Sequence, residues 1–276
     1  MELDIFLNNA LIFFAVIMTI LTVVFVVAMA LRDNSIMDIA YGATFALAGT
    51  ALLFINERSD TLAILIVGCV VLWALRLSIR IGRKNIGTGE DERYAAWRAD
   101  WEARSTTYFV LRSYLQIYLL QGFIIAVVGL PLVLAISFAH ELDEVWLAVG
   151  LAIAVFGLLY ETTADWQLDR FIARKKAETE TADLMTTGLF HYSRRPNYFG
   201  EVLVWWGLAF AVLPVSLGYY ALLSPIVITY IVTRVTGPML ERIFLERYPA
   251  QYTHYMETTS YLVPWPPKTV PDKGTE

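Results

Sequence analysis

Residues 188–207 read GLFHYSRRPNYFGEVLVWWG and mark the place where a polar loop enters an apolar helix. Proline disfavours a helical conformation in the residue before it, Arg195, and is itself well accepted in the first helical turn. We therefore expect a helix to begin at Pro196. A helix start presents free N–H groups and partial positive charge, so Arg194 and Arg195 beside it would complete a seat for a phosphate or a carboxylate. The alternative is that both arginines are only the basic flank of a membrane helix.

An amide and an acid inside this helix favour the binding interpretation. Asn197 and Glu201 are four residues apart and therefore share one helix face, and the phenol of Tyr198 lies in the same turn. Ionisable side chains are costly within a membrane and are usually functional where they occur. We therefore treat Arg195, Asn197, Tyr198 and Glu201 as candidate binding residues.

The composition indicates an integral membrane protein. Hydrophobic residues make up 57% of the chain and charged residues 17%, and the charges are bunched between long apolar runs. The runs are residues 3–31, 36–55, 62–81, 108–138, 145–167, 198–217 and 219–235. We predict an all-α protein with seven transmembrane helices in one bundle. It would form a single domain over residues 1–265, with its motifs concentrated in residues 160–265, followed by a disordered tail over residues 266–276.

Basic residues set the expected orientation. They concentrate after the first, third, fifth and seventh runs, whereas the opposite loops carry Arg58 and otherwise acids. The N-terminus is therefore expected outside and the C-terminus in the cytoplasm. The net charge of −5 and the lack of a basic groove with interleaved aromatics argue against nucleic-acid binding. No metal-ligand spacing occurs, and the single Cys69 cannot form an intramolecular disulfide.

The N-terminal half carries three candidate catalytic residues. Asp38 and Tyr41 are three residues apart near the cytoplasmic end of the second run, which makes them a candidate proton-donor pair. Alternatively, Asp38 only complements the helix dipole. Arg76 lies deep in the third run, so we expect it to face the bundle interior and to meet an anionic ligand or Asp38.

Two further features concern the membrane boundary and the fourth run. Residues 82–107 turn polar and include Trp97 and Trp101, which predicts a short interfacial helix that is either a surface helix or a lid. Pro131 predicts a kink in the outer half of the fourth run.

The fifth and seventh runs end in charged groups. An acidic stripe is formed by Glu161, Asp165 and Asp169. The repulsion between these like charges is reduced either by the hydroxyls and amines of a ligand or by nearby arginines. Arg234 lies near the cytoplasmic end of the seventh run. Glu241 belongs to an amphipathic segment rich in tyrosine that either closes the mouth of the bundle or lies on the membrane surface.

One polar cavity that opens to the cytoplasm would account for these charged groups together. Several arginines in one cavity imply a ligand with more than one negative charge, most simply phosphates.

Four motifs together resemble the steroid 5-alpha-reductase family, and in particular its bacterial branch. They are GLFHYSRRPNYFGE at 188–201, ADWQ at 164–167, Gln121-Gly122, and LERYPAQY at 245–252. The chain is similar, more distantly, to sterol C14 and delta-7 reductases. The resemblance implies a seven-helix protein of a bacterial inner membrane that holds NADPH near its cytoplasmic face and takes a lipophilic substrate from the membrane.

Site residues follow from the resemblance position by position. Asp165 matches an acid on the cofactor-binding face, Asn197 and Glu201 match groups that contact the dinucleotide, and Arg234 matches a phosphate-binding arginine. Arg195 fits the sterol-reductase form of the motif, and Tyr198 and Glu241 complete the expected cofactor-binding set.

The resemblance implies hydride transfer from NADPH to an activated C=C of a steroid-like or other lipophilic enone. The glutamate and tyrosine that hold the ketone in the steroid enzymes have no clear counterpart here, so Asp38, Tyr41 and Arg76 are the candidates for that task. A buried acid would stabilise the enolate charge that develops on the carbonyl oxygen.

Two other functions remain open. Isoprenylcysteine carboxyl methyltransferases have a similar Arg-x-Pro-x-Tyr motif, which would make S-adenosylmethionine the cofactor. A non-catalytic membrane binding protein or a transporter is the alternative of another class, although transporters usually show internal repeats and this chain shows none.

Overall fold

The computed structural model describes the whole chain except residues 86, 88, 139–140, 142 and 270–276. All regular structure in the described part is helical, which confirms the predicted all-α class. Six helical stretches in that part are long and apolar enough to cross a membrane. These are Glu2–Leu31, Ile36–Ile55, Thr61–Asn85, Thr106–Val128, Glu144–Lys176 and Gly218–Arg247.

The sixth predicted run forms the helix α9 over Pro196–Ala211, which has only 16 residues. A straight span of the hydrocarbon core needs about 20. The helix stops short because residues 212–217 form a turn that contains Pro214.

The chain divides into two compact units. Unit 1 consists of Met1–Leu151 and Leu208–Ser224, and unit 2 consists of Ala152–Gly207 and Pro225–Glu276. The helices α8 and α9 each begin in one unit and end in the other.

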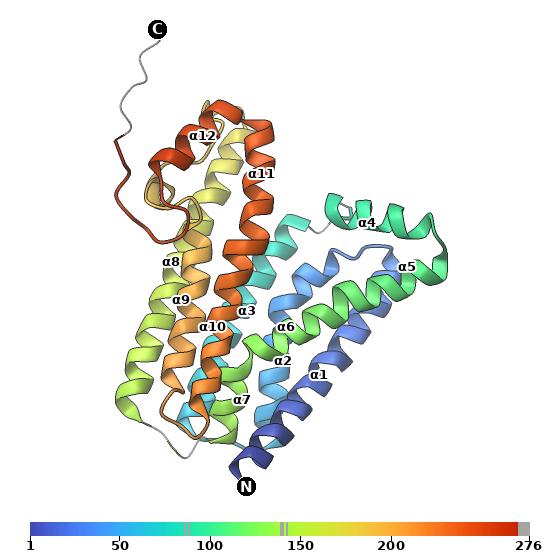
Figure 1. Cartoon of the computed structure of the whole chain (residues 1–276), viewed down its shortest axis with the longest axis vertical. Helices are drawn as coiled ribbons and strands as arrows, with labels where there is room; N and C mark the ends of the chain where they lie inside the picture. Colours follow the sequence, from blue (N-terminus) through green and yellow to red (C-terminus); the bar gives the residue numbers. More distant parts are fainter. Residues whose placement is uncertain (86, 88, 139–140, 142, 270–276) are drawn as a thin grey trace. The chain divides into compact units, whose positions relative to one another are not determined.

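Unit 1 begins with three long helices, α1 (Glu2–Leu31), α2 (Ile36–Ile55) and α3 (Thr61–Asn85) (Figure 1). The helix α2 packs against both of its neighbours. On α1, Phe13, Ile17 and Leu21 recur every four residues and are fully buried, so one stripe of this helix faces the interior. The Asn9 amide donates to the Ser137 hydroxyl at 2.9 Å, which satisfies both buried groups.

The fourth predicted run is not one helix. It consists of α5 (Thr106–Ser113), the π-helical segment η1 (Tyr114–Leu119), α6 (Leu120–Val128) and α7 (Leu130–Ser137). Instead of a kink at Pro131 there is a break at Gly129, where a side chain would collide with the Phe13 ring. Pro131 lies in the first turn of α7, where its missing N–H costs no hydrogen bond.

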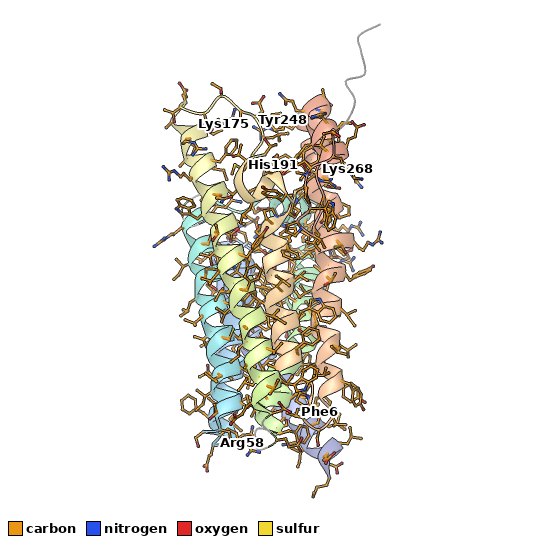
Figure 2. All side chains as sticks on the ribbon, turned by 90° about the vertical axis from the view of Figure 1, so that its left-hand side faces the viewer. Phe6, Arg58, Lys175, His191, Tyr248 and Lys268 are labelled. Atoms are coloured by element: carbon orange, nitrogen blue, oxygen red, sulfur yellow. The ribbon has the colours of Figure 1, made fainter. Side chains whose placement is uncertain are left out.

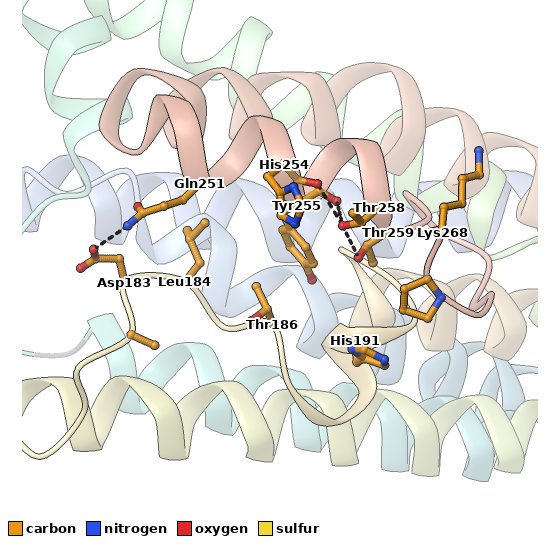
Figure 3. Close-up of a pocket in the computed structure, with 12 residues that line it drawn as sticks. Asp183, Leu184, Thr186, His191, Gln251, His254, Tyr255, Thr258, Thr259 and Lys268 are labelled. Atoms are coloured by element: carbon orange, nitrogen blue, oxygen red, sulfur yellow. Dashed lines mark hydrogen bonds between the residues drawn. The ribbon is translucent and has the colours of Figure 1, made fainter. Parts of the chain in front are cut away.

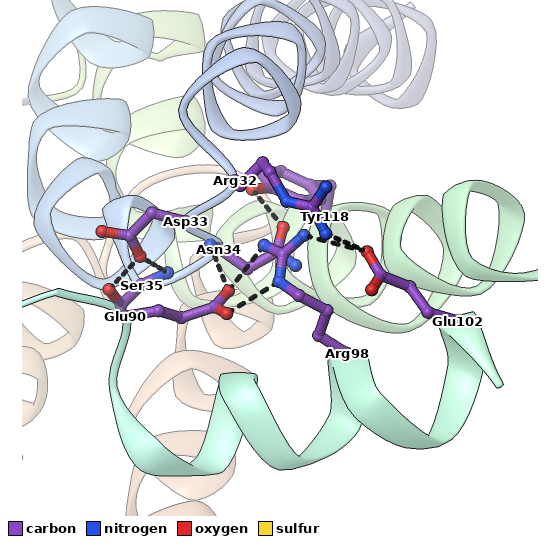
Figure 4. A network of polar contacts seen from close by, with 8 residues as sticks. All are labelled: Arg32, Asp33, Asn34, Ser35, Glu90, Arg98, Glu102 and Tyr118. Atoms are coloured by element: carbon purple, nitrogen blue, oxygen red, sulfur yellow. Dashed lines mark hydrogen bonds and ion pairs between the residues drawn. The ribbon is translucent and has the colours of Figure 1, made fainter. Parts of the chain in front are cut away.

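The predicted interfacial helix is α4 (Glu92–Glu102), and a network of ion pairs and hydrogen bonds holds it to the turn between α1 and α2 (Figure 4). Arg98 makes two bonds of 2.8 Å to Glu90, and both side chains are about nine-tenths buried. Glu90 also accepts the backbone N–H of Asn34 at 2.8 Å, and Arg32 donates to Glu102 at 2.9 Å. The structure thus fixes α4 against unit 1 rather than leaving it a free surface helix.

Unit 2 contains the larger, C-terminal part of α8 (Glu144–Lys176), the start of α9 and the C-terminal helices. The segments α10 (Leu223–Tyr230), η4 (Ile231–Thr236) and α11 (Gly237–Arg247) follow one another without a break, and α12 is Pro249–Thr258. Figure 2 shows Lys175, His191, Tyr248 and Lys268 gathered at one end of this unit.

The helices α8 and α9 cross at two glycines. A methyl group on Gly157 would lie 2.7 Å from the Gly200 carbonyl oxygen, and one on Gly200 would lie 2.6 Å from the Glu161 backbone nitrogen. Only glycine allows so close an approach. The crossing places Glu161 directly against the first turns of α9.

The predicted tail at residues 266–276 is described only in part. Residues 266–269 form no helix, yet the Lys268 N–H donates to the Thr258 carbonyl at 2.8 Å. Residues 270–276 lie outside the described residues.

We predict that Gly200→Ala destabilises the protein. Its methyl group would overpack the crossing of α8 and α9, which typically costs about 1–3 kcal/mol, so the melting temperature in detergent should fall. Gly68→Ala is the matched control, because Gly68 lies within α3 and a side chain there would meet nothing within 4 Å. That control should gain about 0.5–1 kcal/mol from helix propensity. Equal effects of the two substitutions would contradict the close crossing.

Candidate functional site

The predicted helix start is confirmed, because α9 begins at Pro196. The loop before it forms a short 3-10 helix, η2 (Gly188–His191). Its first residue, Gly188, has a positive φ of 63°. The Gln167 side-chain oxygen on α8 accepts the Leu189 N–H at 2.9 Å, and it fills the space where a side chain on residue 188 would lie. The ADWQ motif and the GLF segment therefore contact each other through Gln167 and Leu189.

Arg194 is buried and anchors the chain around it. Its guanidinium donates to one oxygen of Glu241 at 2.6 and 3.0 Å, and to the carbonyls of Thr259 at 2.7 Å and Met256 at 3.1 Å. The Arg194 backbone N–H donates to the Ser260 carbonyl at 2.8 Å. Charge-assisted bonds of this kind are stronger than neutral ones. Arg194 therefore joins the start of α9 to α11 and to the segment after α12.

Three more side chains secure the same contact. The Ser193 hydroxyl donates to the Leu262 carbonyl at 2.8 Å, and Tyr255 donates to the Phe190 carbonyl. Tyr261 donates to the Val232 carbonyl in η4, and only a glycine at position 237 leaves room for its hydroxyl. Burial raises the pKa of Tyr261 to about 12, so this phenol remains a donor at neutral pH.

Arg195 behaves differently from its neighbour. Its guanidinium lies over the rings of Phe244 at 5.4 Å and Tyr198 at 5.8 Å. Its Nε and Nη2 atoms are buried and meet no hydrogen-bond acceptor within the described residues. A buried polar group without a partner costs about 1–3 kcal/mol, and more when it is charged. Arg195 thus presents two costly donors that an anion would satisfy.

A second donor without a partner lies beside Arg195. The Tyr252 hydroxyl on α12 is buried and is also unpaired in the part of the chain that the structure describes. Burial raises the pKa of Tyr252, and the positive charge and the N–H groups of Arg195 act in the opposite direction. The two groups are therefore near neighbours, although their geometry falls short of a hydrogen bond. We call Arg195 and Tyr252 the donor pair.

Two acids of the predicted stripe are buried in the same unit. Glu161 and Asp165 on α8 are each 4% exposed, whereas Asp169 is exposed. Buried carboxylates are stable only when other groups compensate their charge. The glycine crossing explains how Glu161 comes to lie against α9, and it could not be read from the spacing of the acids.

The remaining predicted cofactor residues divide by environment. Asn197 and Glu201 are half-buried on α9, and Arg234 is exposed on η4. Glu241 accepts the Arg194 guanidinium, so the structure gives it an anchoring role that the sequence did not predict. The donor Tyr252 was missed, because the tyrosines at helical spacing predicted only a surface or covering helix.

The three predicted catalytic residues belong to unit 1. Asp38 accepts the Tyr94 hydroxyl at 2.7 Å and the Arg93 guanidinium at 3.1 Å, which fastens α4 to the start of α2. Tyr41 packs against the rings of Phe45 and Trp73. Arg76 is half-buried on α3. The partners of Asp38 lie more than 50 residues away in sequence, so no local pattern revealed them.

A comparison with protein families finds one match over most of the chain. The model of the family described as protein of unknown function (DUF1295) matches residues 24–259. No protein of curated function and no solved structure matches.

We predict that Arg194→Gln strongly destabilises unit 2. The substitution leaves the Glu241 carboxylate without its buried partner, which costs about 3–5 kcal/mol. The melting temperature should fall, and limited proteolysis should release the segment after α12. Arg242→Gln, an exposed arginine on the same helix as Glu241, should stay within about 0.5 kcal/mol of the unchanged protein. If Arg194→Gln were as stable as Arg242→Gln, the anchoring role would be wrong.

Proposed function

We propose that this chain, which belongs to the DUF1295 family, is a membrane-embedded reductase that binds NADPH through unit 2 and reduces an activated C=C of a lipophilic enone. The observation that carries the proposal is Arg195. It lies at the start of an apolar helix, and two of its buried donors meet no acceptor in the part of the chain that the structure describes. Such a group fits the phosphate of a dinucleotide.

The side chains of unit 2 fit the parts of such a cofactor. Arg195 and the Tyr252 hydroxyl supply donors for a phosphate, and the free N–H groups of the first turn of α9 add partial positive charge. Asp165 and Glu201 offer acceptors for ribose hydroxyls, and Asn197 offers an amide for either kind of contact. Arg234 is exposed and is the second candidate for a phosphate.

When bound, the reduced nicotinamide supplies a hydride. The tasks of this chain are to position the substrate, to keep water away and to stabilise the charge that develops on its carbonyl oxygen. Asp38 with Tyr41, or Arg76, are the candidates for the last task. Asp38 accepts two bonds from α4, so it can serve this task only as the protonated acid, which donates its O–H to the carbonyl oxygen.

The same donors leave one alternative open. A single guanidinium at a helix start holds a carboxylate as well as a phosphate, and S-adenosylmethionine carries a carboxylate. A membrane methyltransferase is therefore the second candidate function. A binding protein or transporter is the third, and it predicts binding of neither cofactor.

We further propose seven spans, with the N-terminus outside and the C-terminus in the cytoplasm of a bacterial inner membrane. The helix α9 and the apolar residues up to 217 would supply the seventh span. The basic residues that follow the first, third, fifth and last spans support this orientation.

We predict that NADPH raises the melting temperature of the purified protein and that Arg195→Gln weakens its binding. Loss of a charge-assisted bond of about 1.5–3 kcal/mol corresponds to a dissociation constant at least about tenfold higher, measured by fluorescence titration. Arg242→Gln removes the same charge from an exposed position and should bind normally. Because the buried Nε and Nη2 of Arg195 bond to none of the described residues, Arg195→Gln should keep its fold. Protection by S-adenosylmethionine but not by NADPH would reject the reductase in favour of the methyltransferase.

We predict that Asp38→Asn and Tyr94→Phe separate catalysis from the anchoring of α4. Both substitutions weaken the contact between α2 and α4, but only the first removes the acid. With a panel of lipophilic enones, Asp38→Asn should lower the rate of NADPH oxidation by about 100-fold or more, the usual contribution of a proton donor. Tyr94→Phe should stay within about tenfold. Equal losses in both variants would show that Asp38 acts only through α4.

A further inference from the structure

Unit 2 holds a second polar site, a pocket of about 500 Å³ that none of the motifs predicted (Figure 3). One wall is the loop at residues 182–186 together with His191, and the other is α12 with Lys268 after it. The members of the donor pair, Arg195 and Tyr252, do not line this pocket. It therefore needs an explanation of its own.

The lining is rich in hydrogen-bond donors. His191 and His254 face it from opposite walls, and each imidazole has an N–H in either protonation state. Thr186 adds a hydroxyl. Lys268 lies at the rim with an exposed side chain, and its flexible stem allows the ammonium to turn toward a bound group.

The one acid of the lining is already compensated. Asp183 accepts the Lys175 ammonium at 3.0 Å and the Gln251 amide at 3.2 Å. The Lys175 bond and the Gln251 bond hold the pKa of Asp183 below its ordinary value, so it carries a negative charge that Lys175 balances. Among the described lining residues, the remaining charge is that of Lys268. The pocket is therefore suited to an anion.

Hydrogen bonds fix the backbone that carries these donors. Tyr255 donates to the Phe190 carbonyl next to His191, and the Thr258 hydroxyl donates to the His254 carbonyl at 2.9 Å. The Lys268 N–H donates to the Thr258 carbonyl at 2.8 Å. Burial raises the pKa of Tyr255, which therefore stays a neutral donor. The walls are held in place before any ligand arrives, which lowers the cost of binding.

We infer that this pocket binds a phosphate monoester group, held by His191, His254, Thr186 and Lys268. A phosphate monoester offers three acceptor oxygens and up to two negative charges, which match several donors converging from two walls. The group belongs either to a soluble phosphate compound or to the headgroup of a lipid. The inference is independent of the proposed function, because it concerns residues that the proposed NADPH site does not use.

The test uses the full chain in nanodiscs of phosphatidylcholine. Inorganic phosphate is added against chloride at the same ionic strength, and in a second arm phosphatidic acid replaces part of the phosphatidylcholine. Either addition should raise the melting temperature. The double variant His191→Gln with His254→Gln should reduce that shift by at least about half, and Lys268→Ala should reduce it as well. Lys176→Ala, an exposed lysine outside the pocket, is the matched control and should respond like the unchanged protein.

The outcomes decide both the inference and the source of the ligand. A response to inorganic phosphate assigns the pocket to a soluble compound, and a response to phosphatidic acid alone assigns it to a lipid headgroup. No response in either arm, or an equal response in the histidine variant, would overturn the inference. NADPH binding by the same histidine variant separates this result from the reductase proposal, which does not need His191 or His254.

Discussion

The burial of the Arg194 guanidinium is the constraint on which the candidate site depends. A charge this deep is tolerated only when every donor finds an acceptor, and Glu241 with two backbone carbonyls supplies them. These bonds hold the loop before α9 against α11 and the segment after α12. Ser193, Tyr255 and Tyr261 strengthen the same junction. The start of α9 is thereby held rigid without any ligand.

The rigid start of α9 fixes the position of the neighbouring Arg195. Pro196 restricts the backbone conformation of Arg195. The Arg195 guanidinium lies over the rings of Tyr198 and Phe244, which attract its positive charge. These aromatic rings do not accept hydrogen bonds from the N–H groups in the plane of the guanidinium. Arg195 is therefore positioned and left with donors to spare, which is the arrangement expected of a binding group rather than of an anchor. Two adjacent arginines thus divide the two tasks.

The sequence predicted the features that depend on local pattern. Proline marked the start of α9, the apolar runs marked the membrane helices, and the tryptophans between them marked α4. It did not distinguish Arg194 from Arg195, because the difference lies in acceptors that are 47 to 65 residues away along the chain. For the same reason it did not predict the bond between Glu241 and Arg194, and it missed Tyr252.

Other differences come from packing that hydropathy does not report. The fourth run breaks at Gly129 because the Phe13 ring occupies the space of a side chain there. The helix α9 ends at Ala211, so six helices of the described part, rather than seven, have the length and composition of a span. Glu161 lies against α9 because Gly157 and Gly200 let two backbones approach. The first and the last of these differences depend on glycines whose neighbours are far away in sequence.

An electron cryomicroscopy map of the protein in nanodiscs with NADPH would show directly whether Arg195 binds the dinucleotide. The account predicts density for a phosphate within about 3 Å of the Arg195 guanidinium, the distance of a charge-assisted hydrogen bond, with the Tyr252 hydroxyl beside it and Arg194 still bound to Glu241. The account would be contradicted by a map in which NADPH binds elsewhere or in which Arg195 bonds to an acid of the protein itself.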